Sequence, residues 1–148
     1  MTLLVVRVAD TDFVRRRLSE MAEALGYMRR VLEEGEEEFA RDFRSRLALR
    51  HLVLMVVESA ASIALHILAE DFGERADSYS EAFTKLSYRG VLSPKVASEM
   101  ASLTRLGNLI VHRYWLVDDL RIYREAKGSG PLVVEGFIRE VRRYVEGG

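Results

Sequence analysis

The stretch Leu52–Leu68, LVLMVVESAASIALHIL, is the most apolar part of this 148-residue chain. Apolar side chains fall on nearly every side of a helix drawn through it, which is typical of a helix at the centre of a bundle or in a subunit contact. The stretch is long enough to resemble a membrane span, but Glu58 and His66 lie within it and charged residues flank it. We therefore predict a buried central helix and no membrane association.

Helices are also predicted on both sides of this stretch, where apolar residues recur every three or four positions. Glycines mark where these helices stop, and Ser, Asp and Pro mark where they start. The predicted helices run from about Asp12 to Glu34, from Glu36 to Asp71, around Tyr79–Leu86, from Pro94 to about Tyr114, and from Asp118 or Asp119 onward with an interruption at Gly128–Pro131. The expected fold is an all-α antiparallel bundle of about five helices.

One domain is expected to span residues 1–148, because a chain of this length can bury a core without a second domain. Residues 1–9 precede the first helix, and weak alternation from Leu3 to Val8 predicts a short strand or a flexible extension. The N-terminus lacks the basic region and cleavage site of a signal peptide, so a cytoplasmic protein is expected.

Residue usage excludes several classes of protein and site. Lys and Arg number 22 and Asp and Glu 23, so no net field draws the molecule to nucleic acid or anionic lipid, and any such binding must be local. Cysteine is absent, which excludes a disulfide framework and thiolate-bound zinc and fits a reducing compartment. No two histidines have the spacing of metal ligands, so neither a metal nor another cofactor is expected.

Amide side chains are almost missing from the chain, which has no glutamine and only one asparagine, Asn108. Together with a charged surface rich in arginine, this loss of thermolabile residues indicates a thermophilic source. If amides are selected against, Asn108 is retained for a reason. Its neighbourhood is therefore the first place to look for function.

Asn108 lies in the predicted fourth helix, and helical periodicity divides that helix into two faces. Arg105 and His112 fall on the same side as Asn108, two turns and about 10 Å apart, whereas Gly107 falls on the apolar side. Two interpretations remain open from spacing alone. One is a solvated helix face, and the other is a phosphodiester site in which arginine offers forked donors and histidine exchanges a proton near neutral pH.

The segment RLGNLIVHRYW (residues 105–115), followed by Asp118, resembles the signature of the HepT-like toxins of the HEPN superfamily. That signature is an arginine, four to six residues, a histidine, one residue and a tyrosine. The likeness extends to the order of the helices and covers most of the chain from about Asp12. One position departs from it. Many members have arginine directly before the asparagine, where this chain has Gly107, so the nearest upstream arginine is Arg105.

The resemblance implies a HEPN-type antiparallel bundle that forms a homodimer, with two copies of the signature facing each other across a cleft. It implies the toxin of a toxin–antitoxin module, an endoribonuclease that cleaves its RNA substrate without a metal when the 2′-hydroxyl attacks the adjacent phosphorus. His112 would act as general base in one subunit and general acid in the other. Arg105 would stabilise the phosphorane, and Asn108 would orient the phosphate or the imidazole.

The resemblance gives Tyr114 a different role. The family's antitoxin is a minimal nucleotidyltransferase that attaches AMP to the tyrosine of the signature, and the added phosphates place negative charge where RNA phosphate must bind. On a continuous helix Tyr114 would point about 180° from Arg105. The helix is therefore expected to end or bend near Tyr114.

Two other functions stay open from the sequence. They are a non-catalytic HEPN module that binds a nucleotide or docks the partner, and a helical bundle with a structural role. Other candidate residues are assigned to structure: Trp115 and Tyr123 are interpreted as core aromatics, His66 as a core or interface residue with a satisfied hydrogen bond, and Arg139, Arg142 and Arg143 as a solvated face.

Overall fold

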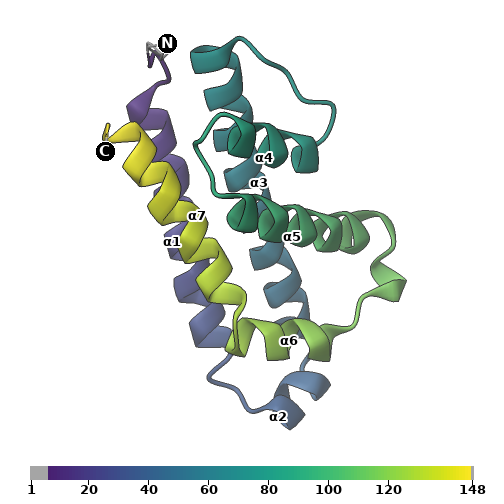
Figure 1. Ribbon diagram of the computed structural model, residues 1–148. Helices are drawn as coiled ribbons and strands as arrows, with labels where there is room; N and C mark the ends of the chain where they lie inside the picture. Colours follow the sequence, from purple (N-terminus) through teal and green to yellow (C-terminus); the bar gives the residue numbers. More distant parts are fainter. Residues whose placement is uncertain (1–6, 148) are drawn as a thin grey trace.

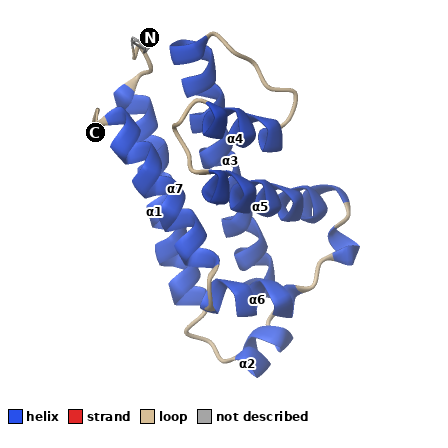
Figure 2. Ribbon diagram, viewed as in Figure 1, coloured by secondary structure: helices blue, strands red, loops and turns tan. Residues whose placement is uncertain are grey.

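The computed structural model describes residues 7–147, and every regular element in that part of the chain is helical (Figure 2). The elements are α1 (Thr11–Val31), α2 (Glu36–Arg41), α3 (Phe43–Phe72), α4 (Tyr79–Tyr88), α5 (Pro94–His112), the 3-10 turn η1 (Tyr114–Leu116), α6 (Asp119–Lys127) and α7 (Gly130–Val145). The predicted all-α fold is confirmed. Two of the predicted helices are each divided in two, so the helices outnumber the five expected.

α3 forms the axis of the bundle (Figure 1). α1 packs along one side of it, α4 and α5 pack against the other, and α2 and α6 contact its N-terminal part. Its buried residues include the successive residues Ser59, Ala60 and Ala61, which point about 100° apart and so confirm the predicted central position. By length and composition α3 could also cross a membrane, but most of its most apolar window is buried inside the protein, as in a core helix.

Asp42 separates α2 from α3. Its backbone is extended (φ −97°, ψ 98°), and its carboxylate accepts hydrogen bonds from the backbone N–H groups of Arg44 at 3.0 Å and Ser45 at 3.4 Å. These are N-cap bonds, which satisfy the first N–H groups of α3. The prediction of one helix from Glu36 to Asp71 is therefore wrong at Asp42, and the acidic run starts a separate short helix.

Glycine ends α3 and shapes the turn before α7. Gly73 ends α3, as predicted, and its backbone is in the left-handed conformation (φ 62°). At the first residue of α7, a Cβ on Gly130 would lie 2.9 Å from the carbonyl oxygen of Glu125, which is too close for any other residue unless the backbone shifts. The predicted interruption at 128–131 is thus a tight turn, after which α7 packs along α1 (Figure 1).

Residues 7–10 are held against α3 and α7. The Asp71 carboxylate accepts hydrogen bonds from the backbone N–H groups of residues 8 and 9 at 2.6 and 2.8 Å, and from the Tyr144 hydroxyl at 2.6 Å. His66 Nε2 accepts the backbone N–H of Asp10 at 2.8 Å, which confirms a satisfied structural histidine. Residues 7–9 form neither a strand nor a free extension, and residues 1–6 of the predicted extension lie outside the described chain.

Candidate functional site on α5

α5 is positioned by a cap at its start and by apolar contacts along one face. Ser93 Oγ accepts a hydrogen bond from the backbone N–H of Val96 at 3.2 Å, and Pro94 occupies the first turn, as predicted. Met100 and Ile110 are buried on the face that meets the neighbouring helices. The opposite face is left to solvent.

Gly107 lies on the buried face, where α5 approaches α3. A Cβ built on Gly107 would lie 3.5 Å from Val57 Cγ2 and 3.7 Å from Leu54 Cδ2. These are ordinary contact distances for a methyl group, but a longer side chain would have to pass these two residues. A close helix–helix contact therefore fills the position where the HepT-like signature commonly has arginine.

Arg105, Asn108 and His112 are exposed on the other face of α5, as helical periodicity predicts. Arg105 Nη2 donates a hydrogen bond to Ser102 Oγ at 2.9 Å. Asn108 and His112 are one turn apart, so their Cβ atoms are about 5–6 Å from each other. Together the three side chains form an open polar face, which we call the α5 face.

Two hollows of the described surface lie away from the α5 face. One, of about 540 Å³, is lined by residues that include Tyr27, Arg30 and His51. The other, of about 650 Å³, lies along α7 beside Arg139 and Arg142. Within residues 7–147, no three His, Asp or Glu side chains are grouped so as to hold a metal ion. Because the α5 face is open, a ligand bound there would be enclosed only by a second molecule.

α5 ends at His112, two residues before the tyrosine. Arg113 leaves helical geometry (φ −141°, ψ 47°), and the chain turns through η1, where the Leu116 N–H donates to the Arg113 carbonyl oxygen at 2.9 Å. The predicted end of the helix near Tyr114 is confirmed. The direction of Tyr114 is therefore set by the turn rather than by the periodicity of α5.

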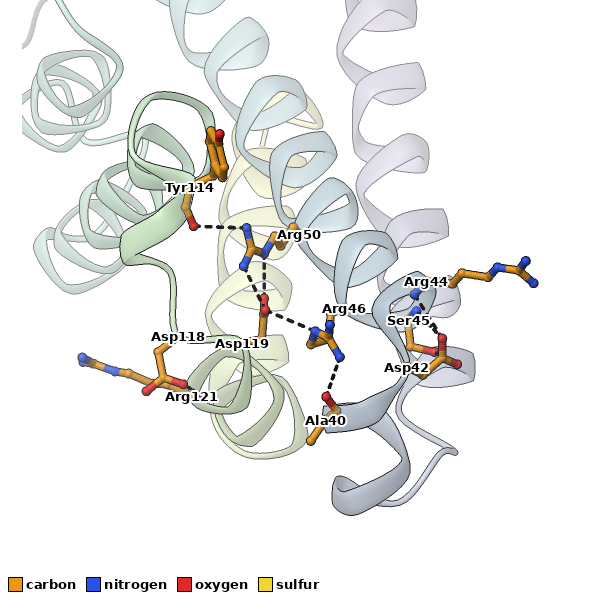
Figure 3. Close-up of polar contacts among 10 residues, drawn as sticks. All are labelled: Ala40, Asp42, Arg44, Ser45, Arg46, Arg50, Tyr114, Asp118, Asp119 and Arg121. Atoms are coloured by element: carbon orange, nitrogen blue, oxygen red, sulfur yellow. Dashed lines mark hydrogen bonds and ion pairs between the residues drawn. The ribbon is translucent and has the colours of Figure 1, made fainter.

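An ion pair between α3 and α6 braces this turn (Figure 3). Arg50 donates from Nε and Nη2 to the two carboxylate oxygens of Asp119, at 2.7 and 2.9 Å, and from Nη1 to the Tyr114 carbonyl oxygen at 3.3 Å. The Arg50 and Asp119 side chains are only 17% and 16% exposed. The hydrogen bonds with Asp119 raise the pKa of Arg50 more than burial lowers it.

Sequence reasoning missed this pair. The sequence predicts only that Asp118 or Asp119 caps a helix, and the cap is Asp118, whose carboxylate accepts the Arg121 N–H at 3.2 Å. Arg50 is one of the charged residues that flank the apolar stretch, and nothing in the sequence gives it a partner. Because the two partners are 69 positions apart, no local spacing could connect them.

The two aromatic residues assigned to the core behave differently. Tyr123 is 5% exposed, its ring centroid lies 4.8 Å from that of Phe39, and its hydroxyl donates to the Glu34 carbonyl oxygen at 2.9 Å, so its core role is confirmed. Trp115 is 67% exposed, with its ring 5.3 Å from that of Tyr114, so the prediction of a core role is wrong. The 3-10 turn carries Trp115 away from the bundle.

Substituting Gly107→Arg is expected to lower the free energy of unfolding by about 1–3 kcal/mol, since the new side chain must displace Val57 or Leu54. Urea unfolding followed by circular dichroism measures the change. Asn108→Arg is the control, because the adjacent position is exposed and a surface substitution changes stability by no more than about 0.5 kcal/mol. Equal stability of the two variants would mean that α5 can move off α3 without loss.

Comparisons with known proteins agree with this architecture. The sequence pattern of a family described as "Ribonuclease HepT-like" matches residues 21–141. A curated relative from Aphanizomenon flos-aquae (strain 2012/KM1/D3), named tRNA nuclease HepT, is 23% identical over 135 residues, which cover 89% of each chain.

Solved structures show the same fold at low sequence identity. A tri-AMPylated Shewanella oneidensis HEPN toxin in complex with its MNT antitoxin has a TM-score of 0.83 and 17% identity, over 90% of this chain and 98% of that one. YutE from Bacillus subtilis, described as a cytosolic protein of unknown function, has a TM-score of 0.80 and 17% identity, over 96% of this chain and 94% of that one.

Proposed function

The chain belongs to the HepT-like ribonuclease family, and from that premise we propose that it is an endoribonuclease and the toxin of a toxin–antitoxin pair. The observation that carries the proposal is the α5 face. Arg105, Asn108 and His112 stand exposed on one side of a helix whose other side is fixed on the core, within the residues that match the family.

The α5 face offers the groups that RNA cleavage by internal attack requires. His112 accepts the proton of the ribose 2′-hydroxyl as the 2′-oxygen forms a bond to the adjacent phosphorus. A second His112 donates a proton to the 5′-oxygen as its bond to phosphorus breaks. Arg105 can direct two N–H donors at the charged phosphorane, and Asn108 orients the phosphate or the imidazole. No step requires a metal.

A homodimer supplies the second histidine. The α5 face is open in one protomer, and Val111, next to His112, is 55% exposed. Phe43 and Leu47 are 57% and 56% exposed on the part of α3 that precedes Arg50, whose side chain contacts the Tyr114 carbonyl oxygen just after α5. Apolar side chains grouped on a surface are typical of association sites. We propose that a second copy covers this surface and so places two copies of His112 on opposite sides of one phosphate.

Tyr114 is proposed as the site of neutralisation. Its side chain is 61% exposed on the turn after α5, and a structural relative is a tri-AMPylated HEPN toxin bound to its MNT antitoxin. The antitoxin partner would be a small nucleotidyltransferase that transfers AMP from ATP to the Tyr114 hydroxyl. The attached phosphate would bring negative charge to the approach of the RNA backbone, close to His112.

RNA cleavage in the presence of a chelator tests the proposal. Purified protein is expected to cleave RNA in EDTA, and Arg105→Ala is expected to lower the rate by about 10²–10³-fold, as when one donor to a developing oxyanion is removed. Arg105→Lys keeps the positive charge but loses the paired N–H donors of the guanidinium, so its cleavage rate should lie between those of wild-type protein and Arg105→Ala. If wild-type protein and Arg105→Ala cleave equally, another group binds the phosphate. No cleavage by wild-type protein would overturn the enzymatic function.

A non-catalytic docking module is the second candidate, and Gly107 favours it. The position that commonly carries arginine in the family contributes no side chain here, and the nearest upstream arginine, Arg105, leaves the helix from a different side. This alternative predicts that the nucleotidyltransferase modifies Tyr114 although the unmodified protein leaves RNA intact. Intact-mass measurement combined with the chelator assay separates the two functions.

A further inference from the structure

We propose that Arg50 and Asp119 are positioning residues for Tyr114, because their ion pair holds the turn that presents this tyrosine to a modifying enzyme. The purpose of the positioning rests on the proposed function, in which Tyr114 receives AMP. We call Arg50 and Asp119 the clamp. Neither residue belongs to the α5 face.

None of the three side chains of η1 is buried, although Val117, the residue after η1, packs partly against the core. Tyr114, Trp115 and Leu116 are 61%, 67% and 55% exposed. Hydrogen bonds within the connection, such as the Val117 N–H to the Tyr114 carbonyl oxygen at 3.2 Å, shape the turn but do not attach it to the bundle. Holding the turn in one orientation costs conformational entropy, so contacts from another element must offset that free-energy cost.

The clamp supplies those contacts at both ends of the connection (Figure 3). Arg50 Nη1 binds the carbonyl oxygen of Tyr114, where the connection starts, and Nε and Nη2 bind Asp119, where α6 begins. Arg50 itself projects from α3, the most extensively packed helix of the bundle. Because a forked arginine–carboxylate pair fixes direction as well as distance, the turn is oriented relative to the central helix.

Orientation matters for nucleotidyl transfer to tyrosine. The Tyr114 oxygen forms a bond to the α-phosphorus of ATP, the bond between the α-phosphorus and the bridging oxygen breaks, pyrophosphate leaves, and the hydroxyl proton passes to a base of the transferase or to water. The rate of such a reaction falls by about 10²-fold when the attacking atom is misplaced by about 1 Å. A mobile turn would leave the nucleophile intact but badly placed.

Two clamp variants and one matched control separate positioning from stability. Asp119→Asn removes the charge opposite a largely buried guanidinium, and Arg50→Lys keeps the charge but removes the fork. Glu74→Gln is the control. It breaks a second forked pair, in which Arg89 donates to the Glu74 carboxylate at 3.2 and 2.9 Å, and it leaves the turn untouched. Each variant is checked for an unchanged circular dichroism spectrum and molar mass.

The first readout needs no partner protein. Trp115 is the single tryptophan of the chain and lies in the turn, so its fluorescence reports on the turn alone. Asp119→Asn is expected to lower the steady-state anisotropy of Trp115 and to increase its quenching by acrylamide, with a smaller change in Arg50→Lys. Glu74→Gln should match the wild type. Unchanged Trp115 signals in both clamp variants would overturn the clamp.

The second readout is AMP transfer by the partner nucleotidyltransferase with ATP, followed by intact mass. Asp119→Asn is expected to lower kcat/KM for modification by about 10- to 10²-fold relative to Glu74→Gln. Equal rates in these two variants would overturn the positioning role even if Trp115 becomes mobile. If wild-type protein accepts no AMP, the proposed modification fails, and the Trp115 measurements then decide alone whether the clamp holds the turn.

Discussion

His112→Ala is expected to lower the rate of RNA cleavage by about 10²–10⁴-fold, the usual contribution of positioned proton transfer. His112 is exposed at the last position of α5, so its removal opens no cavity and the fold should persist. The measurement is kcat/KM on a short RNA in EDTA as a function of pH. Wild-type protein should give a bell-shaped profile, because one copy of His112 acts as base and the other as acid.

His51→Ala is the matched control for this prediction. His51 is also an exposed histidine on a helix, but it lies beside the hollow lined by Tyr27 and Arg30 and not on the α5 face. Its replacement should leave cleavage unchanged. Equal rates of RNA cleavage by His112→Ala and wild-type protein would show that His112 is not the group that cleaves. Dilution tests the need for a dimer. Because one phosphate needs two copies of His112, the cleavage rate per protomer should fall at the concentrations where light scattering shows that dimers dissociate.

Tyr114→Phe is expected to abolish AMP addition, because the phenolic oxygen is the atom that forms the new bond. RNA cleavage should continue at nearly the wild-type rate, since Tyr114 takes no part in the proposed proton transfers. The result would be a toxin that its partner cannot silence by modification. Intact mass after incubation with the nucleotidyltransferase and ATP, followed by the cleavage assay, measures both effects.

Tyr88→Phe tests whether exposure alone selects the modified tyrosine. Tyr88 is 80% exposed at the end of α4, more than Tyr114 at 61%. If the turn after α5 is the recognised feature, Tyr88→Phe should accept as much AMP as the wild type. Continued silencing of Tyr114→Phe by the partner would contradict the neutralisation that we propose.

Much of the fold could be predicted because local patterns determine it. The stretch Leu52–Leu68 is apolar on nearly every side and therefore lies inside the bundle, Gly73 allows a left-handed helix end, and Ser93 with Pro94 marks a helix start. Asp42 was missed because an aspartate inside a helical pattern can point to solvent or cap the next helix. Only the N–H groups of Arg44 and Ser45, placed by the fold, decide between these roles.

In the candidate site, too, the features that depend on local pattern could be predicted from the sequence. A period of 3.6 residues places Arg105, Asn108 and His112 on one face. The resemblance gives Tyr114 a role at this site, and because a continuous helix would turn Tyr114 away from Arg105, an end or bend near Tyr114 is expected. Periodicity cannot predict where a chain goes after a helix ends. The exposure of Trp115 and the bracing of the turn by Arg50 depend on tertiary contacts between distant positions.

The close approach of α5 to α3 at Gly107 has an evolutionary consequence. An arginine at position 107 and full-sized side chains at Val57 and Leu54 compete for the same space, so the effects of substitutions at these positions should not be additive. A lineage that gained an arginine at position 107 would first need a smaller residue on α3. The order of substitutions, as well as their number, would then determine which descendants of this sequence can carry the more common form of the signature.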